Sequence, residues 1–306
     1  MIQKKLATIA FIPLILFFFL FSPETACSSQ RQRIALVIGN GNYQFNPLVN
    51  PVNDANDMAA VLKKCNFKVI KTINATRQQM RQSIRRFGEA IVEGDAVGLF
   101  YYSGHAIQVD GENYLVPIGA GVYGEDEVED ECLKVSSVLR KMETARNRLN
   151  IIVLDACRDN PFRGSFRSST RGLAKMDAPI GSIFAFSTAP GSVAADGVGK
   201  NGLYTSVLLK HMLTPNLEIG QLFRRVRIEV IAASDDKQVP WESSCLTGNF
   251  YFNPGRGISV LNRPLPPVLE SIKKYEKIIH DQPAKVFPSK SKPRREKKRI
   301  IPLPTF

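Results

Sequence analysis

A cysteine and a histidine in this sequence have side chains that could together carry out covalent chemistry. Both residues occur in the same local context, shortly after a run of apolar residues. Cys157 follows the aliphatic run 151–154 after two residues, and His105 follows the apolar run 96–102 after two residues. An imidazole beside a thiol can take up the thiol proton, and the resulting thiolate can attack a carbonyl carbon. The pair is therefore suited to acyl transfer if the fold brings the two residues together.

The apolar runs before these residues predict the elements that would position them. Four consecutive aliphatic residues, Ile151–Leu154, are typical of a strand buried on both faces inside a parallel sheet. The run Ala96–Tyr102 has the same character. Open α/β sheets bind ligands at the carboxyl ends of their strands. Adjacent parallel strands would bring His105 and Cys157 to that edge.

The rest of the chain up to about residue 252 alternates between strand-like and helix-like segments. This alternation predicts an α/β fold with right-handed crossovers. The expected strands are 33–39, 67–73, 96–102, 151–154 and 181–187, with 249–252 closing the sheet, and the expected helices are 54–64, 77–91, 135–142, 202–212 and 219–233.

The residues around the cysteine and the histidine match a known family. The segments Ser103-Gly104-His105 and Asp155-Ala156-Cys157-Arg158, separated by 157 − 105 = 52 positions, resemble the caspase-like cysteine peptidases. Within them, the chain is similar to the metacaspase, paracaspase and bacterial branch, from about residue 33 to 252. The resemblance implies a mostly parallel, twisted sheet of about six strands flanked by helices.

The same resemblance implies roles for the residues of the reaction centre. Cys157 would be the nucleophile, and His105 would be the base that later donates a proton to the leaving amine. A backbone carbonyl usually orients the histidine in this family. The resemblance assigns the oxyanion to the backbone N–H groups of Ala106 and Cys157. Most relatives have glycine where this chain has Ala106, which matters only if a positive φ is needed there.

Acidic residues at the family's pocket positions predict the substrate. Asp155, two residues before the cysteine, and Asp54 would bind a guanidinium or ammonium group, and Ser103 would line the same wall. Asp196 could also face this pocket. A structural alternative exists for each acid of the pair: Asp155 could pair with Arg158, and Asp54 could simply begin a helix.

Composition argues against a metal centre or a disulfide scaffold. The five cysteines include no Cys-x-x-Cys pair, and there are only three histidines. We expect no cofactor, although some metacaspases need calcium. The acidic run 125–131 lacks the glycine and spacing of an EF-hand loop, and a solvated loop and helix start is its simpler interpretation.

The two ends of the chain differ from its centre. Residues 1–30 combine Lys4 and Lys5 with an apolar run, as in a signal peptide or an N-terminal membrane anchor, so we expect an exported or membrane-anchored protein. Residues 31–254 form the expected peptidase domain. Residues 255–306 are proline-rich and basic, which predicts a disordered tail. The net charge of +13 owes much to this tail and to the loop 158–175, so we expect no nucleic-acid partner.

Together these observations predict a cysteine endopeptidase that cuts proteins or peptides after Arg or Lys. Arg163, Arg167, Arg171 and Lys175 lie in the segment between two expected strands, close to the catalytic edge, so the enzyme could also process itself. The alternative from another class is a catalytically silent caspase-like domain that acts as an interaction module.

Overall fold

The computed structural model describes residues 32–91, 96–157, 173–189 and 199–255, and these contain an eight-stranded sheet. Its main path runs β2-β1-β3-β6-β7-β8, with parallel pairing throughout except between β7 and β8. The end of β3 pairs antiparallel with β4, which pairs with β5. The strands are β1 (Arg33–Gly39), β2 (Lys68–Ile73), β3 (Val97–Val109), β4 (Glu112–Leu115), β5 (Leu133–Lys134), β6 (Leu149–Cys157), β7 (Ser182–Phe186) and β8 (Trp241–Ser244).

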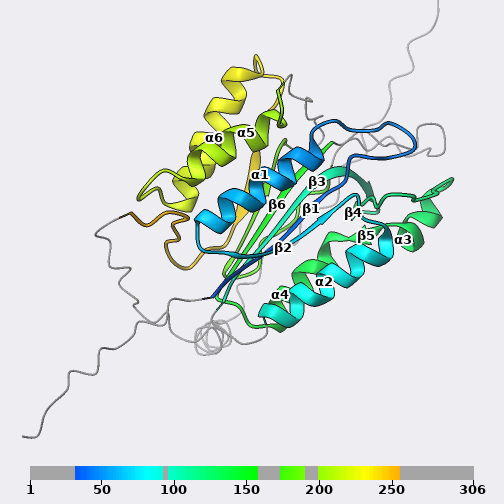
Figure 1. Ribbon diagram of the computed structural model, residues 1–306, viewed down its shortest axis with the longest axis horizontal. Coiled ribbons are helices and arrows are strands. Elements are labelled where there is room, and N and C mark those ends of the chain that lie inside the picture. The colour runs from blue at the N-terminus through cyan, green and yellow to red at the C-terminus, as the bar shows by residue number, and fades with distance from the viewer. Residues whose placement is uncertain (1–31, 92–95, 158–172, 190–198, 256–306) are drawn as a thin grey trace, which may run out of the picture. The chain divides into compact units, whose positions relative to one another are not determined.

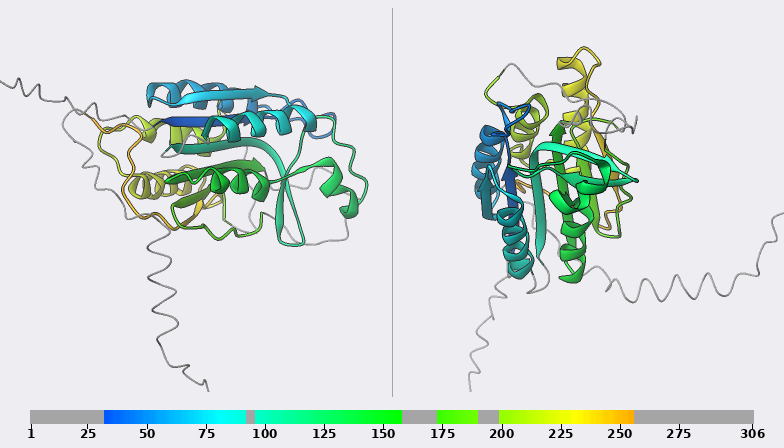
Figure 2. Two further views of the ribbon diagram at one scale, coloured as in Figure 1. Left: turned by 90° about the horizontal axis from the view of Figure 1, so that it is seen from below. Right: turned by 90° about the vertical axis from the view of Figure 1, so that its right-hand side faces the viewer.

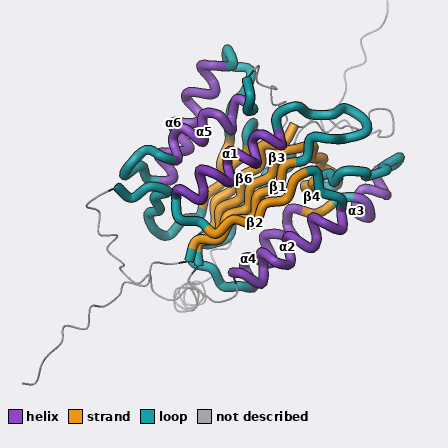
Figure 3. Tube along the Cα trace, viewed as in Figure 1, coloured by secondary structure: helices purple, strands orange, loops and turns teal. Residues whose placement is uncertain are grey.

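Helices cover both faces of this sheet (Figures 1 and 3). One face packs against α1, α5 and α6, and the other packs against α2 and α4. The short α3 follows a 3₁₀ turn, Glu125–Glu127, and belongs to neither layer. The helices are α1 (Pro51–Lys64), α2 (Arg77–Ile91), α3 (Val128–Glu131), α4 (Val135–Thr144), α5 (Leu203–Met212) and α6 (Ile219–Ala233).

Burial on both faces explains the continuous apolar runs of the central strands. In β1, Ala35 and Val37 belong to the core under α1, whereas Leu36 and Ile38 belong to the core under α2. Successive strand residues point to opposite faces, so a strand between two helical layers needs apolar residues at every position. Figure 2 shows the resulting layers, with the sheet between two sets of helices. The predicted α/β fold with a mostly parallel sheet is confirmed.

The predicted closing strand is wrong. The last strand is β8, Trp241–Ser244, whereas in the segment 249–252 only Tyr251 forms an isolated bridge, to Glu218. The rings of Phe250 and Phe252 instead fill the core on the α6 side, with centroids 5.0 Å apart. The strand β8 lies at the edge of the sheet and is partly exposed, and three of its four residues are polar. It therefore lacks the apolar run by which other strands were predicted.

Two predicted boundaries also moved. The strand β3 continues to Val109, well beyond the expected end at Tyr102, because its last residues pair with β4. His105 therefore lies inside a strand. The helix α1 begins at Pro51 and not at the expected Asp54. Proline suits the first position of a helix because the N–H that it lacks would have no partner within the helix there. In the described ranges, no helix is long and apolar enough to cross a membrane.

Candidate active site

The pairing of β3 with β6 places the two candidate catalytic residues side by side. The parallel register aligns Ser103 with Asp155, Gly104 with Ala156 and His105 with Cys157. Two motifs separated by about fifty residues in sequence thus become direct neighbours at the carboxyl edge of the sheet, as expected. The thiol of Cys157 lies outside the described part of the structure, so its position is known from the strand alone.

The orientation of the His105 ring follows from one contact with the loop after β1. The ring is buried, and its Nε2 lies 2.7 Å from the carbonyl oxygen of Asn46. A carbonyl oxygen can only accept a hydrogen bond, so Nε2 must carry the proton in this contact. Nδ1 is then the ring nitrogen that can accept a proton from a thiol. The orienting carbonyl expected from the family resemblance is thus that of Asn46.

Tyr43, on the same loop, holds the histidine from a second side. Its ring centroid lies 4.5 Å from that of His105, and its hydroxyl accepts the His105 backbone N–H at 3.0 Å. The same hydroxyl donates to the carbonyl of Val116 at 3.1 Å. These contacts leave little room at Gly104, which has φ +153°. A Cβ there would lie 2.7 Å from the Tyr43 hydroxyl and 2.8 Å from that of Tyr102.

The strand geometry also bears on the oxyanion donors. Val116 donates its N–H to the carbonyl of His105 at 3.0 Å, and the next pair of the β3–β4 ladder is Ala106 with Leu115. Bonded and non-bonded pairs alternate in an antiparallel ladder, so the Ala106 N–H is directed away from β4, toward the side of β6. Ala106 is absent from the described residues with positive φ, so alanine causes no strain there.

The expected pocket acids come together from separate elements. Asp54 lies in α1 and is 2% exposed; its Oδ2 accepts the Ser103 hydroxyl at 3.1 Å and its Oδ1 accepts the Gly202 N–H at 3.0 Å. Asp155 accepts the hydroxyl of Thr205 at 2.6 Å. A Cβ on Gly202 would lie 3.4 Å from an Asp54 carboxylate oxygen and 3.5 Å from one of Asp155, so the two acids converge on one point.

This arrangement raises the pKa of Asp54 to about 7, chiefly because burial disfavours its charged form and then because Asp155 is a second negative charge nearby. Hydrogen bonds from Gly202, Asn201 and Ser103 act in the opposite direction. Two carboxyl groups held together in this way favour either a shared proton or a bound cation. The two carboxyl groups are therefore chemically suited to a guanidinium or ammonium group.

Of the residues predicted for the site, the structure brings Asp54, Ser103, His105 and Asp155 to one edge of the sheet. Asp196 and the arginines of the segment 158–172 lie outside the described residues. Sequence reasoning missed Tyr43, Asn46, Gly202 and Thr205, which contact the site from other segments. A loop tyrosine or a helix-start glycine has no sequence pattern of its own that would predict such a contact.

No group of three or more His, Cys, Asp or Glu side chains in the described ranges could hold a metal ion. The acidic run forms the 3₁₀ turn and α3, where Glu129 pairs with Lys134 at 2.5 Å and Glu127 accepts the Tyr123 N–H at 2.7 Å. The run thus forms a turn followed by a short helix, and these two glutamates have local partners.

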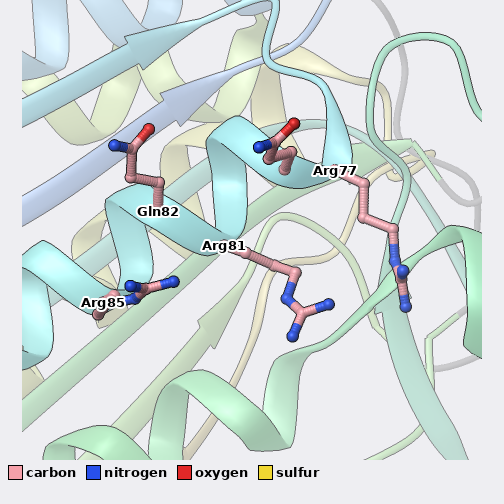
Figure 4. Close-up of a pocket in the computed structure, with 5 residues that line it drawn as sticks. Arg77, Arg81, Gln82 and Arg85 are labelled. Atoms are coloured by element: carbon pink, nitrogen blue, oxygen red, sulfur yellow. The ribbon is translucent and has the colours of Figure 1, made fainter.

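A separate hollow of about 450 Å³ lies along α2, lined by three arginines and two glutamines (Figure 4). The helix α2 packs on the opposite face of the sheet from α1 and α5, which carry Asp54 and Thr205. The basic hollow is therefore not part of the acidic pocket. Its lining residues are Arg77, Gln78, Arg81, Gln82 and Arg85.

Comparisons with known proteins agree on one family. The caspase domain matches residues 32–251. Mucosa-associated lymphoid tissue lymphoma translocation protein 1 of Homo sapiens is 28% identical over 189 residues, which are 61% of this chain and 22% of that protein. A probable protease of a Desulfuromonadales bacterium is 25% identical over 244 residues, covering 70% of this chain and 26% of its own length.

Among solved structures, caspase-1 from Spodoptera frugiperda has the same fold, with a TM-score of 0.54 and 19% identity. That match covers 74% of this chain and 92% of the insect protein. This chain spans about a quarter of the length of the curated relatives that it matches.

Proposed function

Because this chain belongs to the caspase family, we propose that it is a cysteine endopeptidase that cleaves after Arg or Lys through a dyad of His105 and Cys157. The single observation that carries the proposal is the β3–β6 register, which aligns His105 with Cys157 and, two residues earlier, Ser103 with the pocket acid Asp155. One strand pair thus supplies both a reaction centre and part of a cation-binding pocket.

The geometry suggests the order of proton transfers. Nδ1 of His105 takes the thiol proton, and the Cys157 thiolate attacks the carbonyl carbon of the scissile bond. The N–H groups of Ala106 and Cys157 stabilise the oxyanion of the tetrahedral intermediate. The C–N bond then breaks while His105 donates its proton to the leaving amine. Water, deprotonated by His105, hydrolyses the resulting thioester and restores the thiol.

The pocket supports a basic residue before the scissile bond. Asp54 and Asp155 would attract a guanidinium or ammonium group and repel a carboxylate. A bound cation would favour the ionised form of Asp54, against the burial and the neighbouring Asp155 that raise the pKa of that residue to about 7. Substrate binding near neutral pH should therefore release protons.

The direct test compares fluorogenic peptides that differ only in the residue before the cleaved bond: Arg, Lys, Asp and citrulline, the neutral analogue of arginine. We expect cleavage after Arg and Lys and little cleavage after Asp or citrulline, with and without added calcium. Asp155→Asn should reduce kcat/KM for the Arg peptide roughly tenfold to a hundredfold, as for loss of a charge-assisted hydrogen bond. Faster cleavage after Asp than after Arg would overturn the proposed specificity.

Self-processing remains part of the proposal, and the structure refines where we expect the cuts. Leu173 is buried in the core, and Asn113 bonds both backbone groups of Ala174, donating to the carbonyl at 2.9 Å and accepting the N–H at 2.6 Å. Lys175 follows this anchored pair directly, so we expect cleavage at Lys175 to be slower than cleavage at the other three sites. The other three sites, Arg163, Arg167 and Arg171, lie outside the described residues. Mass spectra of wild type beside Cys157→Ala would identify fragments produced by the enzyme itself.

We further propose that residues 1–30, which lie outside the described residues, direct export or membrane anchoring. The support is the Lys4–Lys5 pair followed by an apolar run. The peptidase domain would then act outside the cytoplasmic membrane, on protein or peptide substrates with basic residues. Cell fractionation of the full chain would test this, and a cytosolic protein with an intact N-terminus would contradict it.

A further inference from the structure

A chain of buried hydroxyl groups ends on the pocket acid Asp155. The Tyr101 hydroxyl lies 2.5 Å from the Thr205 hydroxyl, which lies 2.6 Å from Oδ2 of Asp155. Tyr101 and Thr205 are both fully buried, on β3 and α5 respectively. Buried polar groups cost free energy unless they are hydrogen-bonded, so this chain forms a closely fitted unit.

The direction of the hydrogen bonds in this chain can be assigned. A carboxylate only accepts, so the single proton of the Thr205 hydroxyl goes to Asp155. The Tyr101 hydroxyl must then donate to Thr205. The pKa of Tyr101 is raised well above its usual value, first by burial and then by the charges of Asp155 and Asp54, so the phenol keeps the proton that it donates.

The start of α5 and the residue before it contact both pocket acids. Gly202, the residue before the helix, donates its N–H to Asp54, and Thr205 donates its hydroxyl to Asp155. The two donors are three residues apart at the start of one helix, so they have a fixed spacing and their bonds contribute to the separation of the two carboxylates. A pocket that recognises a planar guanidinium depends on that separation, because the fork of N–H groups has fixed geometry.

We propose that Thr205, supported by Tyr101, is a positioning residue that determines specificity by holding the Asp155 carboxyl group aimed at the basic side chain of the substrate. The inference rests on the proposed preference for Arg or Lys and adds a residue of α5 that acts on substrate through Asp155. Its effect is confined to recognition of the cation and does not extend to the proton transfers at His105.

Thr205→Val tests this proposal because valine keeps the shape of threonine and removes the hydroxyl. We expect KM for the Arg peptide to rise roughly tenfold to a hundredfold, as for loss of a hydrogen bond to a charged group, with kcat almost unchanged. The preference for Arg over citrulline should fall by the same factor. The rate at which iodoacetamide alkylates Cys157 should stay at the wild-type value, since the dyad is untouched.

Matched variants separate positioning from general damage. Thr205→Ser keeps the hydroxyl and should restore the Arg preference, whereas Tyr101→Phe should weaken it by less than Thr205→Val does. Ser206→Ala removes an exposed hydroxyl from the same helix, one that bonds only the carbonyl of Leu203 in the described structure, and should change nothing. If Thr205→Val does not fold, Tyr101→Phe and Thr205→Ser carry the same comparison.

The outcomes distinguish this inference from the proposed function. A wild type that cleaves after Arg, with a Thr205→Val variant of unchanged KM and unchanged preference over citrulline, would overturn the inference alone. An equal loss of cleavage of the Arg and citrulline peptides would also overturn it, because that result indicates a structural role. A wild type that cleaves neither Arg nor Lys peptides would overturn the proposed function and this inference with it.

Discussion

The proposed reaction centre and the proposed cation pocket lie at the same edge of the sheet but are built by different means. His105 and Cys157 are aligned by the backbone register of two adjacent strands, and the histidine ring is then fixed by the Asn46 carbonyl. Asp54 and Asp155, by contrast, accept hydrogen bonds from the Ser103 side chain in β3, the Thr205 side chain in α5 and the backbone of Gly202 just before α5. In this proposal the chemistry depends on main-chain pairing, whereas the specificity depends on tertiary contacts that can be changed one at a time.

The largest effect should come from the two residues aligned by the register. Cys157→Ala and His105→Ala should each reduce kcat for Arg peptides roughly a thousandfold or more, because each removes one half of a unit that acts together. Both variants should stay folded, since the strand pairing does not use these side chains, but His105→Ala should unfold at a lower temperature because its buried ring contacts Tyr43 and bonds the Asn46 carbonyl. If Cys157→Ala keeps full activity, the reaction centre lies elsewhere.

A change at Gly104 should affect the backbone on which the reaction centre depends. Gly104→Ala adds a Cβ within 3 Å of two tyrosine hydroxyls at a φ of +153°. We expect a loss of about 2 kcal/mol in the free energy of unfolding, together with reduced activity, because the added atom must displace Tyr43 or Tyr102. Urea unfolding of both proteins provides the measurement. A variant as stable as wild type would show that this strand segment is more adaptable than its contacts indicate.

A smaller effect, on the pH dependence of the free energy of unfolding, should come from Asp54. The pKa of Asp54 is raised to about 7 in the folded protein, mainly by burial, so the protonated form is the one that favours folding. The contribution of this group to stability is complete at pH values below its unfolded pKa of about 4 and is lost as the pH rises toward 7. Asp54→Asn mimics the neutral form.

Urea unfolding at pH 5 and pH 8 provides the measurement. The free energy of unfolding of wild type should decrease between these values by more than that of Asp54→Asn. Ser206→Ala, on the exposed side of α5, is the control and should follow the wild-type pH dependence. Identical pH dependence in wild type and Asp54→Asn would contradict the raised pKa.

The difference between the two regions also explains what the sequence could predict. The apolar runs before His105 and Cys157 predicted buried parallel strands, and a parallel register then brings the residues that follow those strands to one edge. Asp54 and Asp155 were predicted from the family resemblance. The contacts of Thr205 with Asp155 and of Tyr43 with His105 join residues far apart in the chain, and no local pattern specifies them.

The same reasoning accounts for the mistake at the end of the sheet. Trp241–Ser244 forms the edge strand although it is polar, because an edge strand with one exposed side needs no continuous apolar run. The aromatic segment that looked more strand-like, with Phe250 and Phe252, is used to fill the core. The pattern of apolar residues in a sequence indicates which side chains are buried, but it does not by itself show which segments pair as strands.

Covalent labelling tests the central claim most directly. The claim is that Cys157 is the nucleophile, that His105 is its base, and that an adjacent acidic pocket binds a basic side chain of the substrate. The purified full chain would be treated with acyloxymethyl ketone peptides that end in Arg or Asp, and the labelled residue would be identified by mass spectrometry. We expect the Arg reagent to add once, at Cys157, with the reaction greatly slowed in His105→Ala and with little labelling by the Asp reagent. Preferential labelling by the Asp reagent, or an adduct on Cys65, Cys132 or Cys245 in place of Cys157, would contradict the claim.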